Sequence, residues 1–220
     1  MSIELKKRFF TSIFLIALLV AMYIYPFVMI ISLIIIGIIT WVEFYALISK
    51  IIISNTLKSK FLRFLFKASS LLYLSLLIFF IIVIESYYIN LKLYFVYTLL
   101  VAIFSDIGGL IFGKFFKGKK LTKISPNKTI SGSVGSFFFS LLLIPLFMGQ
   151  LTSFNFLILI LITLLISLIS QLGDLFISFL KRKAKVKNTS DILPGHGGFL
   201  DRVDGIIFAI PLGIMLLNTF

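Results

Sequence analysis

Long apolar stretches alternate with short polar and mostly basic stretches along the 220-residue chain. A helix needs roughly 20 apolar residues to cross the hydrocarbon core of a membrane. On this criterion the pattern predicts membrane-spanning helices over residues 9–25, 27–49, 68–84, 93–112, 136–148, 154–180 and 206–217. The fifth and seventh are short, which leaves open that one of them is re-entrant. We expect an all-α fold, a polytopic integral membrane helical bundle of about seven transmembrane helices.

No separate domain or internal repeat interrupts this pattern. We therefore expect a single integral membrane domain over residues 1–220, with N-terminal helices in residues 1–92 and catalytic helices and cytosolic loops in residues 93–220. Pro26 predicts a tight turn between the first two helices, because proline lacks an N–H donor and restricts the residue before it. The basic segment of residues 50–67 contains interspersed Phe and Leu, which predicts a loop that partly lies in the membrane interface as an amphipathic helix.

The distribution of positive charge predicts the orientation of the helices. The chain carries a net charge of +13, and all but Lys92 of its 21 Lys and Arg residues fall on one side of the predicted topology. Cytoplasmic loops of membrane proteins are enriched in Lys and Arg, so we expect a cytosolic N-terminus and no nucleic-acid partner. Lys6, Lys7 and Arg8 before an apolar run are also typical of a signal peptide, but apolar sequence continues past Pro26, so we expect a retained helix. Cysteine is absent, which excludes disulfides and thiolate metal sites.

The candidate chemistry is concentrated in residues 173–205. This stretch holds four of the eight carboxylates, at Asp174, Asp191, Asp201 and Asp204, and the only histidine, His196. Asp174 falls within the sixth predicted helix, where an ionisable group is costly unless it is paired, hydrated or bound to metal. Its helical face also carries Ser178, Lys181 and Arg182. The alternative is a structural salt bridge from Asp174 to a lysine one or two turns further on.

Asp201 and Asp204 are three residues apart and, if helical, point the same way. Together with Asp174 they would suit Mg²⁺, which prefers oxygen ligands. Alternatively, they stabilise the last helix through its dipole. The Gly195-His196-Gly197-Gly198 turn offers backbone N–H groups to a phosphate, and we expect His196 to be a hydrogen-bond donor rather than a metal ligand.

Two upstream features complete the candidate site. Asp106 lies in the fourth predicted helix, with Gly109 and Gly113 on its face, where small residues allow another helix to approach closely. Asp106 is either functional or a partner in an interhelical hydrogen bond. The sequence from Ser125 to Thr129, followed by glycines, is typical of a phosphate-binding loop before a helix N-terminus, although it lacks the Walker A order. The alternative is an ordinary basic cytoplasmic loop.

These stretches resemble a known family. Residues 178–204, read as SFLKRKAKVKNTSDILPGHGGFLDRVD, are similar to the signature of phosphatidate cytidylyltransferases, also called CDP-diacylglycerol synthases. Residues 106–129 and the Gly173-Asp174-Leu175-Phe176 stretch resemble the same family, in the same order. The chain departs from the family pattern at Asn188, Ile177 and Ser131, where acids are usual, and it is short for the family. The departures leave an inactive relative as one possibility.

The resemblance implies a reaction of CTP with phosphatidate that gives CDP-diacylglycerol and pyrophosphate, on the cytosolic side of a bacterial inner membrane. It implies Mg²⁺ as cofactor, and leaves open a monovalent cation such as K⁺ and a homodimer. The residues assigned to catalysis are Asp174, Asp201, Lys128, Lys181, Arg182 and Arg202. Those assigned to substrate binding are Asp106, Ser125, Thr129, Ser178, His196, Gly197 and Gly198, and those assigned to metal are Asp174, Asp201 and Asp204.

Two other functions stay open at this point. A CTP-dependent lipid alcohol kinase acting on a polyprenol or phytol would transfer the γ-phosphoryl group instead. A transporter could use Asp106 and Asp174 as a relay, although its site would be expected near the membrane midplane rather than at one interface.

Overall fold

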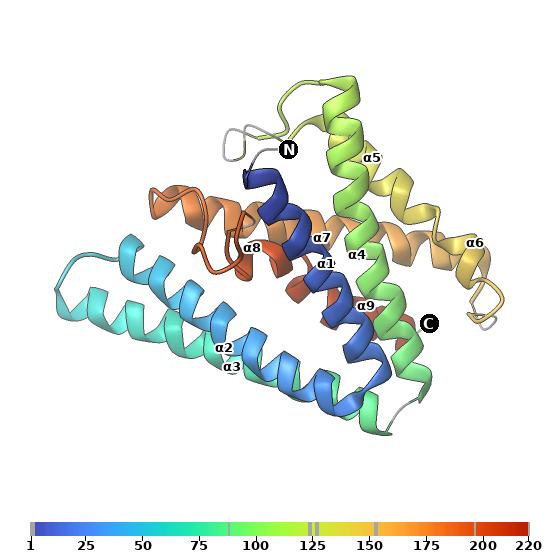
Figure 1. Ribbon diagram of the computed structural model, residues 1–220, viewed down its shortest axis with the longest axis horizontal. Coiled ribbons are helices and arrows are strands. Elements are labelled where there is room, and N and C mark those ends of the chain that lie inside the picture. Colours follow the sequence, from blue (N-terminus) through green and yellow to red (C-terminus); the bar gives the residue numbers. More distant parts are fainter. Residues whose placement is uncertain are drawn as a thin grey trace. The chain divides into compact units, whose positions relative to one another are not determined.

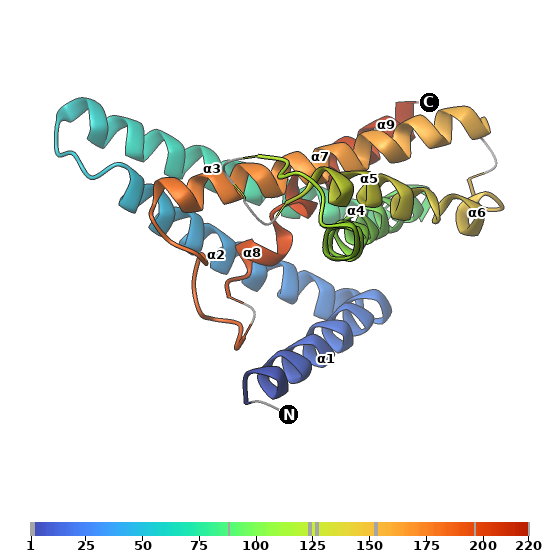
Figure 2. The same ribbon diagram turned by 90° about the horizontal axis from the view of Figure 1, so that it is seen from above.

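A computed structural model of the protein describes residues 3–87, 89–122, 125, 128–151, 154–195 and 197–219. Within these ranges the chain forms nine helices and no strand beyond two isolated β-bridges (Figures 1 and 2). The helices are α1 (Ile3–Ile24), α2 (Pro26–Ile51), α3 (Leu57–Tyr87), α4 (Ile89–Phe116), α5 (Ile130–Leu141), α6 (Ile144–Phe147), α7 (Phe156–Lys183), α8 (Leu200–Val203) and α9 (Ile206–Thr219).

The predicted class, an all-α integral membrane protein, is confirmed. Five segments of the described chain are long and apolar enough to cross a membrane: Pro26–Ile51, Leu57–Ser86, Leu91–Phe116, Ile130–Phe147 and Phe156–Lys183. The apolar part of α1, Phe9–Ile24, is shorter, and α9 has 14 residues. The count of seven spans and the cytosolic N-terminus stay predictions.

Two predicted boundaries are wrong. In the basic segment of residues 50–67 the predicted helical part is confirmed, but the loop is confined to residues 52–56, because α2 continues to Ile51 and α3 already begins at Leu57. Thr56 starts this helix: its side chain accepts a hydrogen bond from the Ser59 N–H (3.3 Å), and Lys and Arg are themselves good helix formers. The fifth predicted helix starts at Ile130 instead of residue 136, because Thr129 caps it and accepts from the Gly132 N–H (3.0 Å).

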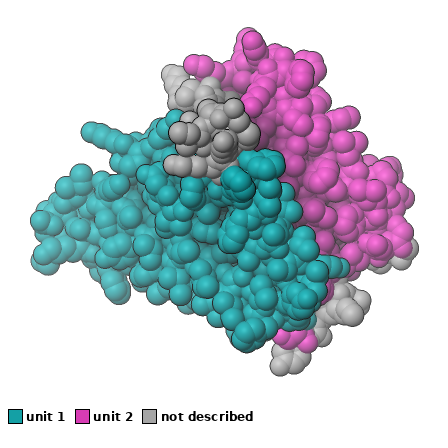
Figure 3. Space-filling view, in the orientation of Figure 1, with its two compact units in different colours: residues 1–85, 180–203 teal, residues 86–179, 204–220 magenta. Residues whose placement is uncertain are grey.

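The described chain divides into two compact units, coloured separately in Figure 3. Unit 1 comprises Met1–Glu85 and Leu180–Val203, and thus α1, α2, α3, the end of α7 and α8. In this unit α2 contacts both α1 and α8, and α2 and α3 run side by side (Figures 1 and 2). Gly37 of α2 lies against Ile78 of α3, which lets these two helices pack closely.

Unit 2 comprises Ser86–Phe179 and Asp204–Phe220. Its core is built on α4, which packs against α5 and α9. Buried hydroxyls are paired across helices: Tyr97 Oη lies 2.5 Å from Thr163 Oγ1, and Ser105 Oγ lies 2.9 Å from Ser167 Oγ. Such pairs satisfy polar groups that water cannot reach inside a membrane protein.

The contact between α4 and α5 depends on glycine. A Cβ added at Gly108 would lie 2.7 Å from the Phe139 Cβ and 2.9 Å from the Gly135 carbonyl carbon. The small residues on α4 therefore admit a neighbouring helix, as the sequence predicted for Gly109 and Gly113. Gly109 and Gly113 take part in the same contact, beside Ser136 and Thr129 respectively.

We expect Gly108→Ala to lower the melting temperature of the detergent-solubilised protein, because overpacking costs about 1–3 kcal/mol. Gly149→Ala is the matched control, since a Cβ at Gly149 meets nothing within 4 Å. Differential scanning fluorimetry of both variants and the wild type measures the effect. Equal melting temperatures for the two variants would contradict the assignment of Gly108 to a tight helix contact.

Candidate active site

Asp201, at the start of α8 in unit 1, accepts hydrogen bonds on both carboxylate oxygens. Lys181 Nζ lies 2.6 Å from Oδ1, in an ion pair whose side chains are 12% and 9% exposed. The Thr189 N–H (2.9 Å) and the Gly198 N–H (3.1 Å) donate to Oδ2, and the Thr189 hydroxyl oxygen lies 3.0 Å from the same atom. Asp201 thus joins the C-terminal end of α7 to residues 189–199, which we name the glycine loop.

These donors determine the charge of Asp201. Burial raises the pKa of this carboxyl, but the hydrogen bonds from Lys181, Thr189 and Gly198 and the positive charge of Lys181 bring it below the ordinary value of 3.8. Asp201 is therefore ionised at neutral pH and keeps the Lys181 ammonium in place.

A second carboxylate, Glu43 of α2, holds the same loop and was not assigned from the sequence. Glu43 is 2% exposed. Its Oε1 accepts from the Ser190 hydroxyl (2.5 Å) and the Phe199 N–H (3.1 Å), and its Oε2 accepts from the Thr189 hydroxyl (2.7 Å) and the Leu200 N–H (2.8 Å). Thr189 Oγ1 therefore lies between Glu43 and Asp201. Four donors meet this one side chain, so Glu43 anchors the loop to α2.

The glycine loop requires glycine at three positions, for lack of space at Gly198 and for backbone conformation at Gly195 and Gly197. A Cβ at Gly198 would lie 2.6 Å from Glu43 Oε1, and closer still to Glu43 Oε2 and Thr189 Oγ1. Gly195 and Gly197 have φ of 77° and 84°, a backbone region that favours glycine. Two backbone hydrogen bonds between Leu193 and Gly197 (2.8 and 3.1 Å) close the turn. His196, which lies in this turn, is outside the described residues.

In unit 2, Lys128 forms an ion pair with Asp174 of α7, and the two side chains are 25% and 26% exposed. Ser178, one turn further along α7, donates to Asp174 Oδ1 at 3.3 Å. Lys128 is positioned by backbone pairing: the Leu121 N–H donates to its carbonyl (2.8 Å), and its own N–H donates to the Ser125 carbonyl (3.0 Å). The predicted loop before a helix N-terminus thus delivers a lysine to Asp174.

The predicted alternative for Asp174, a salt bridge to a lysine one or two turns on, is wrong in its partner. The lysine comes from residue 128, whereas Lys181 of α7 pairs with Asp201. The shared face of Asp174 and Ser178 is confirmed by their hydrogen bond.

The other predicted residues occupy less enclosed or separate places. Asp106 of α4 is exposed, as is Arg202 of α8. Arg182 is also exposed and donates to the Val186 carbonyl at 3.5 Å, which closes the C-terminal end of α7. Asp204 is 6% exposed and accepts from the Gly205 N–H at 2.9 Å. It belongs to unit 2, whereas Asp201 belongs to unit 1.

The predicted Mg²⁺ site can be tested for fit against these contacts. In the described part of the chain, no group of three or more His, Cys, Asp or Glu side chains is arranged to hold a metal ion. Asp201 does not fit a metal ligand in this arrangement, because both of its oxygens face protein donors. Each oxygen of Asp174 also has a protein partner, Lys128 on Oδ2 and Ser178 on Oδ1, but Asp174 fits better because it is partly exposed and the Lys128 ammonium occupies the position of a cation. The metal site itself stays a prediction.

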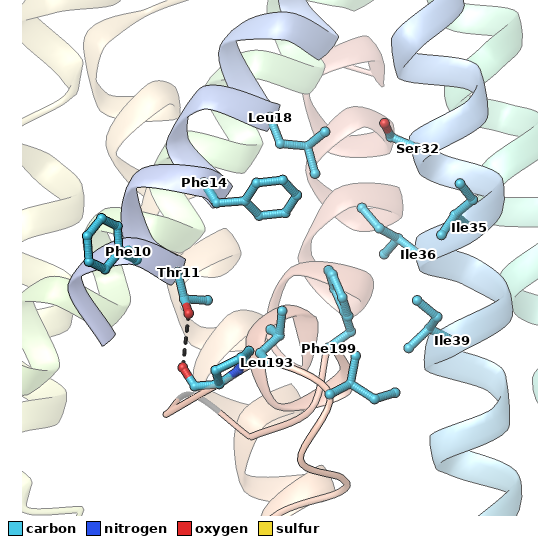
Figure 4. A pocket seen from close by; sticks show the side chains of 12 residues that line it. Phe10, Thr11, Phe14, Leu18, Ser32, Ile35, Ile36, Ile39, Leu193 and Phe199 are labelled. Carbon is cyan, nitrogen blue, oxygen red and sulfur yellow. Dashed lines mark hydrogen bonds between the residues drawn. The ribbon is translucent and has the colours of Figure 1, made fainter. Parts of the chain in front are cut away.

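An apolar pocket of about 550 Å³ adjoins the glycine loop within unit 1 (Figure 4). Phe14 and Leu18 of α1 face Ile36 and Ile39 of α2 across it, and Phe199 closes the loop side. Thr11 Oγ1 donates to the Pro194 carbonyl at 2.9 Å, which ties α1 to the turn. The pocket places an apolar surface next to the carboxylate-anchored loop.

Replacing Glu43 with Gln tests the anchor. One amide nitrogen replaces one oxygen, and in either orientation it faces a backbone N–H, of Phe199 or of Leu200, that cannot accept a hydrogen bond. We expect faster deuterium uptake over residues 189–200, measured by hydrogen-exchange mass spectrometry. Glu85→Gln is the control, because Glu85 lies far from Glu43. The Lys67 carbonyl of α3 accepts from Trp41, two residues before Glu43, and Glu85 lies about 27 Å further along α3. Unchanged uptake in Glu43→Gln would show that Glu43 does not hold the loop.

The depressed pKa of Asp201 gives a pH dependence with a defined sign. A carboxyl with a lowered folded-state pKa contributes stability that is present above its unfolded value, here 3.8, and is lost as the pH falls through the lower folded value. We expect Asp201→Asn to melt below the wild type at pH 7, and the gap to narrow only below about pH 3.8. Melting curves between pH 7 and pH 3 measure this gap, and a gap that closes well above that range would contradict the assignment.

Comparisons with known proteins agree with these motifs. A family model described as the cytidylyltransferase family matches residues 2–220. The phosphatidate cytidylyltransferase of Staphylococcus aureus (strain COL) is 45% identical over 130 residues, which cover 57% of this chain and 50% of that protein. That of Staphylococcus haemolyticus (strain JCSC1435) is 45% identical over 127 residues, 56% of this chain and 48% of that protein. The chain spans about half the length of the curated relatives it matches. Since the family model covers almost every residue, the chain belongs to the cytidylyltransferase family.

Proposed function

We propose that the protein transfers the cytidylyl group of CTP to phosphatidate, giving CDP-diacylglycerol and pyrophosphate. The relatives named phosphatidate cytidylyltransferase support this reaction. The observation that carries the proposal is that both family motifs place a lysine against an aspartate: Lys128 against Asp174 in unit 2, and Lys181 against Asp201 in unit 1. A lysine that is already held in place can stabilise phosphate charge without reorganisation, which is the most effective form of electrostatic catalysis.

The proposed reaction mainly requires stabilisation of the negative charge on the phosphates of the two substrates. A phosphate oxygen of phosphatidate forms a bond to the α-phosphorus of CTP, and the bond from that phosphorus to the bridging oxygen breaks, so that pyrophosphate leaves. No proton transfer is needed, because the attacking phosphate is already ionised at neutral pH. In unit 2, Lys128 would bind phosphate oxygens while Asp174 orients its ammonium group. In unit 1, Asp201 orients the ammonium group of Lys181 in the same way. When bound, Mg²⁺ would neutralise phosphate charge, and Asp174 would hold it.

The surroundings of the glycine loop suit a lipid substrate. The apolar pocket beside the loop would accommodate part of an acyl chain. We also propose that the motifs face the cytosol of a bacterium, where CTP is available. Support for this orientation comes from the Lys and Arg residues concentrated in the segments that carry the motifs.

Position-specific labelling of CTP tests the reaction class. Protein in detergent micelles with phosphatidate and Mg²⁺ should move label from α-³²P CTP into lipid and release label from γ-³²P CTP as pyrophosphate. A lipid alcohol kinase would instead move the γ label into a polyprenol acceptor. Transfer of the γ label, or no turnover of CTP, would overturn the proposal.

Variants test the assigned residues within the same assay. We expect Lys128→Ala and Asp174→Asn each to lower kcat by roughly 100-fold or more, the effect typical of removing a preorganised charge-stabilising group. Asp191→Asn is the matched control, because Asp191 is an exposed carboxylate in the same C-terminal stretch. Wild-type rates in both variants would contradict the assignment of Lys128 and Asp174 to the active site, but not the assignment of the reaction.

A further inference from the structure

A second pocket in unit 1, of about 490 Å³, lies between the C-terminal part of α2 and the N-terminal part of α3. Its walls include Trp41 and Tyr45 of α2, Asn55 of the connecting loop, and Lys60, Arg63 and Lys67 of α3. None of the described residues that line it is a carboxylate. Three cations therefore converge on one cavity without a lining acid to neutralise them.

The aromatic wall is held in a defined geometry. Trp41 Nε1 donates to the Lys67 carbonyl at 3.1 Å, which joins α2 to α3. The Trp41 and Tyr45 rings pack edge to face, with centroids 5.5 Å apart. The Lys67 ammonium lies 3.3 Å from the centroid of the Tyr45 ring, a cation–π contact that keeps its charge at the pocket without consuming it in an ion pair.

Arg63 adds an unused donor. One terminal nitrogen donates to the Ser54 carbonyl at 3.1 Å, which directs the guanidinium toward the loop between the helices. Its Nε atom is buried and has no hydrogen-bond partner among the residues that the structure describes. Because protein atoms cover this nitrogen, the groups of Arg63 that a ligand in the pocket would meet are the terminal nitrogens of its guanidinium. A guanidinium suits a phosphate, because its donors match the spacing of phosphate oxygens.

We propose that this pocket binds the phosphate of an anionic phospholipid. The cations and Asn55 form its polar end, whereas Phe64 and Leu71 extend it with apolar surface. Trp and Tyr are enriched at the level of lipid head groups, and Lys and Arg near the membrane surface attract anionic lipids. A soluble phosphate would use only the polar end. The site is separate from the Lys–Asp pairs and does not depend on the proposed reaction.

The test compares lipid binding by the wild type and by charge variants. Protein in neutral detergent is titrated with short-chain phosphatidylglycerol, short-chain phosphatidylcholine or inorganic phosphate, and bound ligand is counted by native mass spectrometry. We expect the wild type to bind phosphatidylglycerol roughly tenfold more tightly than phosphatidylcholine, given the contribution of each nearby cation. We expect the Lys60→Gln/Arg63→Gln double variant to lose this preference.

The matched control is Lys50→Gln/Lys58→Gln, which removes two cations of the same segment that do not line the pocket and should keep the preference. If the double variant does not fold, the single change Lys60→Glu takes its place, because Lys60 is exposed and its replacement leaves the packing intact. Equal affinity of the wild type for both lipids would overturn the proposal. So would loss of preference in the control, or inorganic phosphate binding as tightly as phosphatidylglycerol.

Discussion

Three donors of the glycine loop and the Leu200 N–H of α8 converge on the buried carboxylate of Glu43, and the arrangement of the C-terminal motif depends on this contact. Burying a carboxylate costs free energy unless its oxygens accept hydrogen bonds, so the loop stabilises the buried Glu43 side chain and Glu43 holds the loop in place. Once the loop is held, its Thr189 and Gly198 N–H groups are directed at Asp201, and Asp201 in turn holds Lys181. A side chain of the second helix thereby determines where a lysine at the end of α7 presents its charge.

The two Lys–Asp pairs both hold a lysine ammonium group in place, but they differ in exposure and in the number of donors to the carboxylate. Lys181 and Asp201 are almost enclosed, and backbone donors share the negative charge of Asp201. Lys128 and Asp174 are about a quarter exposed, and Ser178 is the further partner whose hydrogen bond Asp174 accepts. The first pair is therefore the more rigid, and the second has more room for a phosphate or a cation to enter.

Local patterns in the sequence predicted much of this. The apolar stretches located the long helices, the Ser125–Thr129 stretch predicted a helix start, and the small residues of α4 predicted a close helix contact. Contacts between distant residues were beyond such patterns. The residues around Glu43 do not reveal whether its side chain contacts lipid head groups or a loop of the protein. The lysine that pairs with Asp174 lies 46 residues earlier in the chain, and not one or two turns further along the same helix. The segment of residues 50–67 was predicted to be a loop that is partly an amphipathic helix. It is helical except for residues 52–56, since Lys and Arg side chains can extend to the interface from a helix.

The distance along the chain between Glu43 and its partners has a consequence for biogenesis. Glu43 and Thr189 are 146 residues apart, and synthesis proceeds at about 5–20 residues per second, so the second helix waits roughly 7–30 s before its partners leave the ribosome. During that interval a carboxylate stands in an apolar helix without the loop that satisfies it. The nascent protein must therefore shelter this polar side chain, in the insertion machinery or at the head-group layer, until residues 189–200 arrive. Assembly of the motif then couples two segments that are synthesised many seconds apart.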